Sequence, residues 1–340
     1  MNDLVLRAGP VSMRLRRRQI IVTAASLLVI AAVALLGLCF GAEWSSPPEV
    51  VAALAGHGED VVIIQEWRLP RVTGAVVFGA ALGISGALFQ NLTRNALGSP
   101  DVIGLDAGSY TGTLVVLTVL GGSTVGLSTG AVAGGILAAG LVYFLSRGGS
   151  QLGLRLIIIG IAVNAMLTAI NQWIIMRASL EIAIAGTVWS SGSLSGLGWD
   201  DVTLPFVVIG VLVVCAVLLA RTTHQSTLGD AAAHATGVNL GLLRPALILV
   251  GVGLTAAVTA TCGPIVFIAL AAPQIGRRLA GADGVALLPA ALTGAVLLLA
   301  ADVAAQMALA PVNLPVGVVT TGIGGGYLIW LLMREARRRV

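Results

Sequence analysis

The chain of 340 residues contains no lysine, and charged residues of any kind make up only 10% of it. Soluble domains carry roughly 25% charged residues, and a soluble fold of this length needs charged side chains to cover its surface. Hydrophobic residues reach 57%, and the mean hydropathy is +0.99. The composition therefore excludes a soluble fold and a disordered chain, and it predicts an integral membrane protein.

Residue types that carry catalysis or bind metals are also scarce. The three histidines lie apart in predicted loops, and the three cysteines lie inside apolar runs, where cysteine usually packs as a small apolar side chain. The sequence has no HExxH, CxxC, GxSxG or Walker A motif, each of which would indicate a metal, redox, hydrolase or nucleotide site. We therefore expect no catalytic, cofactor or metal site, and no nucleic-acid partner.

Long apolar runs, by contrast, fill most of the sequence. A spanning helix needs about 20 apolar residues, whereas transmembrane strands would alternate apolar and polar residues. The candidate spans are ten: 19–41, 70–91, 103–121, 124–146, 154–176, 202–221, 245–262, 264–280, 285–309 and 315–333. We predict an all-α, polytopic membrane protein with a cytoplasmic tail over 1–18, a ten-helix domain over 19–333 and a cytoplasmic tail over 334–340.

The placement of arginine sets the predicted orientation. Arginine collects on the cytoplasmic side of membrane proteins, and here one cluster precedes the first span and another follows the last. Both clusters lie inside only if the number of spans is even, so ten spans put both termini in the cytoplasm. Only Arg68, Arg71 and Arg177 then fall outside, together with most of the acidic residues.

Glycine and proline indicate how the helices are built. Several of the 44 glycines stand four residues apart, a spacing that lets helix backbones approach closely in lipid: Gly79/Gly83, Gly130/Gly134 and Gly322/Gly326. Pro264 and Pro273 bracket a short, broken eighth span. Irregular backbone at membrane depth is tolerated only where it is buried in protein or lines a watery cavity, which favours a transporter or channel over an anchor.

One acidic residue, Asp302, lies deep inside a predicted span, after the run Leu-Leu-Leu-Ala-Ala. An intramembrane carboxylate is costly and is by default a functional candidate. Two roles are open: proton or ion coupling, and a structural hydrogen bond that ties helices together. We favour the structural role, since no second acid lies equally deep.

Five motifs stand in order along the chain: 66–72 (EWRLPRV), 79–90 (GAALGISGALFQ), 93–101 (TRNALGSPD), 262–273 (CGPIVFIALAAP) and 314–320 (LPVGVVT). Together they resemble the iron-siderophore and vitamin B12 permease family of ABC importers, over about residues 20 to 334. Within this family, the segments 155–160 (RLIIIG) and 189–199 (WSSGSLSGLGW) are most similar to the second permease subunit of ferric-enterobactin importers.

The resemblance implies a type II ABC importer permease fold with ten transmembrane helices, in the bacterial plasma (inner) membrane and surrounded by membrane lipid. It implies a homologous permease subunit as partner in a heterodimer, two copies of a cytoplasmic ATPase, and an extracytoplasmic siderophore-binding protein. The chain itself would be non-catalytic and carry no cofactor, because ATP and Mg would be bound by the ATPase.

The resemblance also assigns an inner loop to coupling with the ATPase. This loop, between the sixth and seventh spans, resembles the family's coupling helix, which docks in a groove on the ATPase. Its polar, alanine-rich composition suits a short helix at the inner membrane face, and an ordinary loop is the alternative. The residues concerned are Leu228, Gly229, Asp230, His234 and Gly237.

By the same resemblance the cytoplasmic gate corresponds to Asn95, Leu97, Leu152 and Gly153. Many family members have proline where this chain has alanine after Asn95, so we expect a looser gate turn. A histidine of the family is replaced by Gln274, which argues against an essential proton-carrying role at that position.

Arg68 and Arg71 match family arginines that meet acidic residues on the binding protein, and Pro70 stiffens the backbone between them. The alternative is that both side chains reach lipid headgroups or pair with Glu66. The binding protein of such importers has two lobes, each of which meets one permease subunit. A further family arginine is replaced here by Gln306, so we expect this subunit to bind the lobe that faces it more weakly.

The leading function is ATP-driven import of an Fe(III)-siderophore, of catecholate type. Cobalamin or haem uptake is the alternative within the family, and transport of labelled chelates would separate the two. A secondary transporter coupled to protons or sodium would need paired intramembrane acids or unwound half-helices. Of these features, the sequence offers only the single intramembrane acid Asp302. An intramembrane enzyme lacks any nucleophile–base pair.

Overall fold

A computed structural model describes residues 3–8, 11–41, 43–121, 124–147, 152–282, 284–309 and 312–338. A helix lies at each of the ten predicted spans: α1 (Arg17–Cys39), α3 (Leu69–Thr93), α4 (Leu105–Val119), α5 (Thr124–Ser146), α6 (Leu152–Arg177), α8 (Trp199–Ser226), α10 (Leu240–Cys262), α11 (Ile268–Ala280), α12 (Leu287–Ala308) and α13 (Val316–Arg338). Shorter helices lie between them: α2 (Pro47–Leu54), the π-helix η1 (Ile63–Arg68), the 3-10 helix η2 (Asp101–Ile103), α7 (Leu180–Ser190) and α9 (Asp230–Ala235). The helical fold class is confirmed.

The two predicted tails differ from the structure. The first contains an antiparallel hairpin of β1 (Asp3–Ala8) and β2 (Val11–Arg16), which we did not predict. The second strand alternates apolar and polar residues, which is the period of a strand. At the other end α13 continues to Arg338, since arginine is a good helix former and the basic residues extend the helix.

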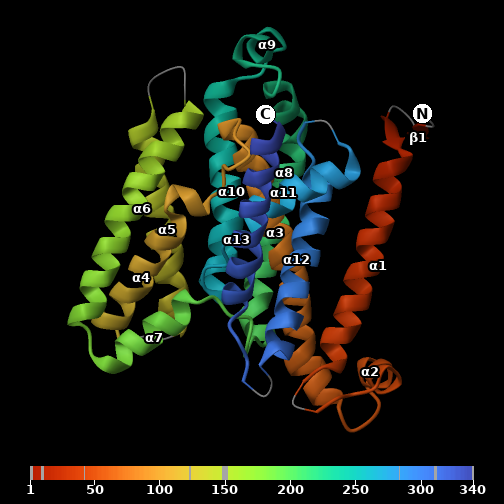
Figure 1. Cartoon of the computed structure of the whole chain (residues 1–340), viewed down its shortest axis with the longest axis vertical. Coiled ribbons are helices and arrows are strands. Elements are labelled where there is room, and N and C mark those ends of the chain that lie inside the picture. Colours follow the sequence, from red (N-terminus) through yellow and green to blue (C-terminus); the bar gives the residue numbers. More distant parts are fainter. Residues whose placement is uncertain are drawn as a thin grey trace.

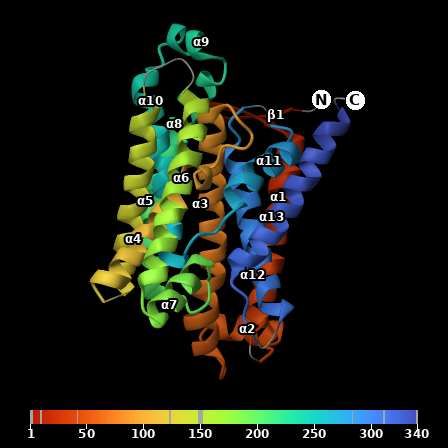
Figure 2. The same cartoon turned by 60° about the vertical axis from the view of Figure 1, so that its left-hand side comes forward.

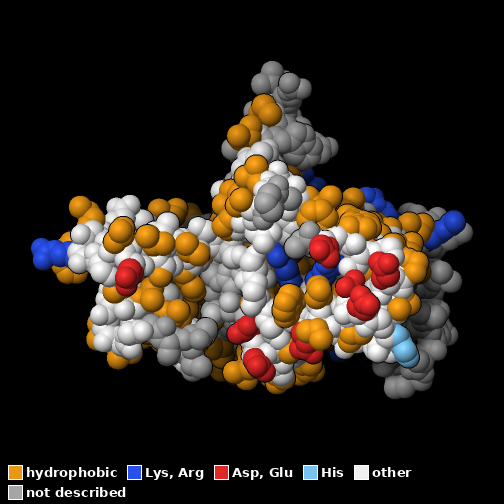
Figure 3. Space-filling model, turned by 90° about the horizontal axis from the view of Figure 1, so that it is seen from below, with side chains coloured by type: hydrophobic (Ala, Val, Ile, Leu, Met, Phe, Trp, Pro, Cys, Tyr) orange, Lys and Arg blue, Asp and Glu red, His pale blue; other side chains and the backbone are white. Residues whose placement is uncertain are grey.

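The long helices stand side by side, and the two ends of the bundle differ (Figure 1). Both chain termini and α9 lie at one end, called here the α9 end. The short helices α2 and α7 lie at the other, the α2 end. Most of the predicted outer-loop acids are exposed there, and Figure 3 shows carboxylates gathered on this face. The exposed acids are Glu43, Glu49, Glu59, Glu66, Glu181, Asp200 and Asp201, while the eighth, Asp60, is half-buried.

Helix α3 forms the centre of the molecule, packed against α10, α11 and α12. In Figure 2 it separates α4 to α7 on one flank from α11 to α13 on the other. A Cβ atom at Gly79 would collide with the carbonyl oxygen of Gly294 in α12, and one at Gly294 would collide with the carbonyl oxygen of Gly79. The predicted close packing through small residues is therefore confirmed for this crossing.

The other two glycine pairs differ from each other. A Cβ at Gly130 or at Gly134 of α5 would collide with the carbonyl oxygen of Gly112 or Gly108 in α4, so the prediction holds there too. By contrast, a Cβ at Gly322 or at Gly326 would meet no described atom within 4 Å. This pair therefore does not hold α13 against its described neighbours.

Two of the predicted spans are helices shorter than the membrane core. By length and composition, seven helices of the described residues are able to cross a membrane, and the predicted spans outside this set are α4, α11 and α13. Helices α4 and α11 have 15 and 13 residues, so they are about 22 and 20 Å long, whereas the hydrocarbon core is about 30 Å thick. The predicted break before the eighth span is confirmed: α10 ends at Cys262, and α11 starts only after Phe267, whose φ is 73°.

Candidate functional site

The predicted coupling segment contains a short helix, α9, that projects from the α9 end between α8 and α10 (Figure 1). A glycine flanks it on each side, Gly229 with φ of 109° and Gly237 with φ of 83°. Only glycine adopts such angles without strain, so these two residues define where the chain turns into and out of α9. Leu228 and His234 are exposed, while Ala233 is buried and anchors the helix. The segment therefore contains a short helix, while its role in coupling stays a prediction.

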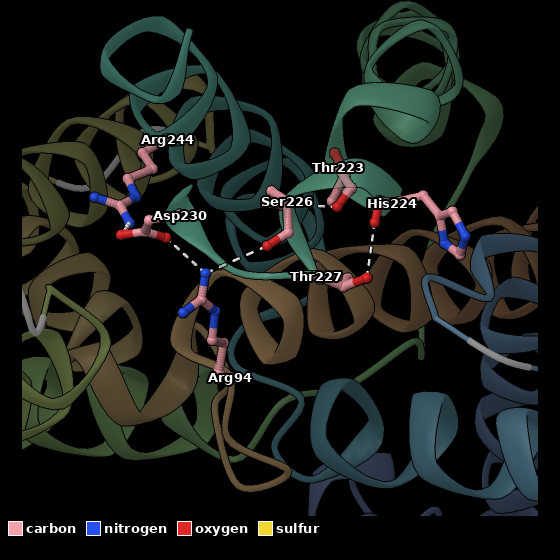
Figure 4. A network of polar contacts seen from close by, with 7 residues as sticks. All are labelled: Arg94, Thr223, His224, Ser226, Thr227, Asp230 and Arg244. Atoms are coloured by element: carbon pink, nitrogen blue, oxygen red, sulfur yellow. Dashed lines mark hydrogen bonds and ion pairs between the residues drawn. The ribbon is translucent and has the colours of Figure 1, made fainter. Parts of the chain in front are cut away.

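Asp230, the first residue of α9, is held by two arginines (Figure 4). Nη2 of Arg94 donates to its Oδ1 at 2.6 Å, and Nη2 of Arg244 donates to its Oδ2 at 2.7 Å. Nη2 of Arg94 also donates to the carbonyl oxygen of Ser226 at the end of α8, at 3.3 Å. The Asp230 carboxylate thus joins the end of α3 to the start of α10, and Arg94 joins both to the end of α8.

The electrostatics of this cluster favour the charged form of Asp230. Partial burial alone raises the pKa of the carboxyl group, but the hydrogen bonds and charges of Arg244 and Arg94 outweigh it and hold the pKa below its ordinary value. The Arg94 and Asp230 side chains are 52% and 38% exposed. Solvent screens such pairs, so the cluster sets geometry more than it adds stability.

Arg94 is also the residue at which α3 turns into the predicted gate loop. It has a left-handed backbone, with φ of 51°, and caps α3. Asn95 follows, and its Oδ1 accepts the N–H of Leu97 at 2.9 Å while its carbonyl oxygen accepts the N–H of Gly98 at 3.0 Å. Two hydrogen bonds close this turn although alanine replaces proline in it, which does not support the expectation of a looser turn.

The structure brings all four predicted gate residues to the end of α3. A Cβ at Gly153 would lie 2.5 Å from the carbonyl oxygen of Thr93, so the start of α6 packs directly against that end. A cavity of about 240 Å³ lies beside this contact, and its lining includes Leu152, Arg94 and Asp230. Leu152 and Gly153 of the predicted gate therefore share a cavity with Asp230 of the predicted coupling segment.

A second cavity, of about 300 Å³, lies on the other side of Arg94 and is lined in part by Asn95 and Gln274. Nε2 of Gln274 donates to Oε1 of Gln90 at 2.8 Å and to the carbonyl oxygen of Ala96 at 3.2 Å. The glutamine therefore ties α11 to the gate loop as a fixed hydrogen-bonding group. Sequence reasoning noted Gln274 but missed Gln90, Arg94 and Arg244, because nothing in the local sequence marks their partners.

At the α2 end, Arg68 already has partners within the chain. Its Nη1 donates to the carbonyl oxygens of Leu38 and Cys39 at 2.7 and 3.2 Å, and its Nη2 donates to the carbonyl oxygen of Glu43 at 2.8 Å. A cation at the carbonyl end of a helix is favourable, and here it caps α1. Pairing with Glu66 is not what the structure shows.

Arg71 and Asp302 form an ion pair inside the bundle. Nε and Nη2 of Arg71 donate to the carboxylate at 2.9 to 3.2 Å, and Nε2 of Gln306 donates to Oδ2 at 2.9 Å. The two charged side chains are 14% and 1% exposed. Docking of a binding protein on Arg68 and Arg71 stays a prediction, and both guanidinium groups would have to meet it while bonded within the chain.

Possible ligands for a metal are dispersed. Among the described residues, no group of three or more His, Cys, Asp or Glu side chains lies close enough to hold a metal ion. The described carboxylates of the α9 cluster and of the Arg71 pair are neutralised by arginine. At the α9 end, the ion pairs of Asp230 connect residues of different helices.

Comparison with known proteins identifies the family. The FecCD transport family matches residues 27–334. The chain belongs to this family. It is 45% identical to the ferric enterobactin transport system permease protein FepG of Escherichia coli (strain K12) over 325 residues, which cover 95% of this chain and 98% of the relative. It is 37% identical to the Fe(3+)-citrate import system permease protein YfmE of Bacillus subtilis (strain 168), over 93% of this chain and 95% of the relative.

A solved structure agrees with the sequence relatives. It is an inward-facing conformation of a metal-chelate type ABC transporter, which superposes with a TM-score of 0.81 at 26% identity and covers 93% of this chain and 99% of that one. The family therefore is that of ABC transporter permeases, and the predicted resemblance is confirmed.

Proposed function

We propose that this chain is the permease subunit of an ABC importer that moves an Fe(III)-siderophore, of catecholate type, into the cytoplasm. The observation that carries the proposal is the 45% identity to a ferric enterobactin permease over almost the whole of both chains. The scarcity of metal-ligating side chains suits such a substrate, since a chelate already satisfies the coordination of its iron.

The proposal includes the partners that the reaction needs. A homologous permease completes the pathway, two copies of a cytoplasmic ATPase bind ATP and Mg, and an extracytoplasmic binding protein delivers the chelate. This chain needs no cofactor of its own. The α9 end faces the cytoplasm in this proposal, which puts both termini inside and presents the projecting helix α9 to the ATPase.

An ion-coupled secondary transporter is a weaker proposal, because its charged candidate is already paired. Asp302 is bonded to Arg71 and Gln306, so both oxygens of its carboxylate already have partners within the chain. The short helices α4 and α11 are compatible with an ABC importer and with a secondary transporter. The pairing of Asp302 is therefore the feature that favours the ABC importer.

The test is transport by the assembled complex in sealed vesicles, with iron-labelled catecholate chelate, haem and cobalamin offered in parallel. We expect ATP-dependent accumulation of the ferric catecholate. Accumulation of haem or cobalamin instead would show that the chain serves a different substrate of the same family. Uptake that persists without ATP but stops when the proton gradient is dissipated would overturn the proposal.

A further inference from the structure

Helix α9 packs mainly against α8 and α10, whereas the predicted gate loop continues α3. The side-chain ion pair of Asp230 with Arg94, at 2.6 Å, joins α9 to the end of α3. The pair thus connects α9 to the residue that immediately precedes the gate loop.

We propose that Arg94 is the positioning residue that passes movement of α9 to the gate loop, with Asp230 as its partner. The inference rests on the proposed function, because it names the residues through which an ATPase acting on α9 would move the gate.

The backbone of Arg94 makes the residue suited to this task. Its left-handed conformation is uncommon for a residue with a side chain and costs energy, so the surrounding contacts determine where it sits. The residue both ends α3 and immediately precedes Asn95. A pull on its guanidinium group consequently acts at the hinge between a rigid central helix and the gate loop.

The Arg94 side chain has space around it. Cavities of about 240 and 300 Å³ are both lined by Arg94, one together with Leu152 and Gly153 and the other together with Asn95 and Gln274. Polar contacts therefore hold the guanidinium group, whereas the backbone just before Arg94 is packed directly against Gly153.

Arg244 fixes the orientation of the Asp230 carboxylate. It holds Oδ2 of Asp230 at 2.7 Å while Arg94 holds Oδ1. The hydrogen bond from α10 thus holds the carboxylate in one orientation, with its other oxygen toward Arg94. Removing Arg94 leaves Asp230 bonded to Arg244, so the variant tests transmission without releasing α9.

The experiment compares variants in the complete complex in vesicles, with iron import and ATP hydrolysis measured together. The variants are Arg94→Gln, Asp230→Asn, their double and the conservative Arg94→Lys. Arg221→Gln is the matched control, because Arg221 is an exposed arginine of α8 near the same end. Solvent screens exposed ion pairs and leaves them little weight in stability, so the variants should assemble normally.

We expect import per ATP hydrolysed to fall at least about five-fold in each single variant, the lower end of a typical coupling free energy. The double variant should lose no more than the worse single, since residues that act as one pair are non-additive. Arg94→Lys should recover part of the coupling, and Arg221→Gln should match the wild type. Unchanged import per ATP in Arg94→Gln, or additive losses in the double variant, would overturn the proposal.

A second readout does not depend on the transported substrate. Leu97 is 44% exposed, so Leu97→Cys can report on the gate loop through its labelling rate with a thiol reagent, with and without ATP and vanadate. The rate should change with nucleotide when Arg94 is present and stay constant with Arg94→Gln. Equal nucleotide dependence in both would contradict the role of Arg94, whereas failure of the wild-type complex to import any ferric chelate would contradict only the proposed function.

Discussion

Arg71 of α3 and Asp302 of α12 form an ion pair that is almost fully withdrawn from solvent, with side-chain exposures of 14% and 1%. The two residues are 231 positions apart, and their pairing joins two helices that also meet through Gly79 and Gly294. Gln306, one turn along α12, donates to the same carboxylate. The central crossing of the bundle therefore combines close backbone packing with a neutralised pair of charges.

The first prediction concerns this pair. Asp302→Asn should lower the melting temperature of the detergent-solubilised protein, because it leaves the Arg71 guanidinium buried without a counter-charge, and breaking a buried pair costs about 3–5 kcal/mol. The double variant Arg71→Gln/Asp302→Asn should melt higher than Asp302→Asn alone.

The control is Asp200→Asn, since Asp200 is an exposed acid at the α2 end. Its melting temperature should equal that of the wild type. Import per correctly folded molecule should largely survive in Asp302→Asn, and complete loss of import at equal protein amounts would show that the charge itself is needed for transport.

The second prediction concerns helix packing. Gly79→Ala should destabilise the protein, because even a methyl group at this position collides with the carbonyl oxygen of Gly294 and forces α3 and α12 apart. Gly210→Ala in α8 is the matched control: a Cβ there meets nothing within 4 Å, and alanine favours a helix over glycine by about 1 kcal/mol. Equal melting temperatures of the two variants would contradict the tight crossing.

The third prediction separates backbone conformation from side-chain bulk at the end of α9. Gly237 has φ of 83° but open space around it. Gly237→Val should lower import, since a β-branched residue is strained at positive φ, while Gly237→Asn should retain most of it, since asparagine tolerates this conformation. Membrane insertion, measured by the amount of solubilised protein, should be normal in both. Equal losses of import in the two variants would show that the added side chain, rather than a strained turn, causes the loss.

Much of the fold could be predicted from the sequence because apolar length and arginine placement act locally. The ten helices, the break after Pro264 and the short helix after Gly229 all follow from runs and turn residues within one segment. The short length of α4 could not be predicted, because the segment 103–121 is as apolar as a segment that spans the membrane completely.

The partners of the candidate site residues were beyond sequence reasoning for a different reason. Arg94 lies 136 positions from Asp230, and only the folded bundle brings them together. The same holds for Arg71, which the positive-inside bias marked as unusual but whose partner Asp302 comes from the far end of the chain. Local patterns identify such residues as exceptional without saying what they contact.

The fourth prediction concerns pH. The folded-state pKa of Asp230 lies below its ordinary value, so the stabilisation from its arginines is present above the unfolded pKa of about 3.9 and is lost as pH falls through the lower, folded pKa. The melting-temperature difference between the wild type and Asp230→Asn should therefore be constant from about pH 5 to 8 and shrink below about pH 4. A difference that changes between pH 6 and 8 would mean that another group controls the cluster.

The most direct measurement of the central claim is accumulation of radioactive iron, supplied as a ferric catecholate, inside vesicles that contain this chain with its permease partner, ATPase and binding protein. The account predicts uptake that requires ATP, survives dissipation of the proton gradient and is absent when this chain is omitted. Uptake that is independent of ATP, or that proceeds equally well without this chain, would contradict it.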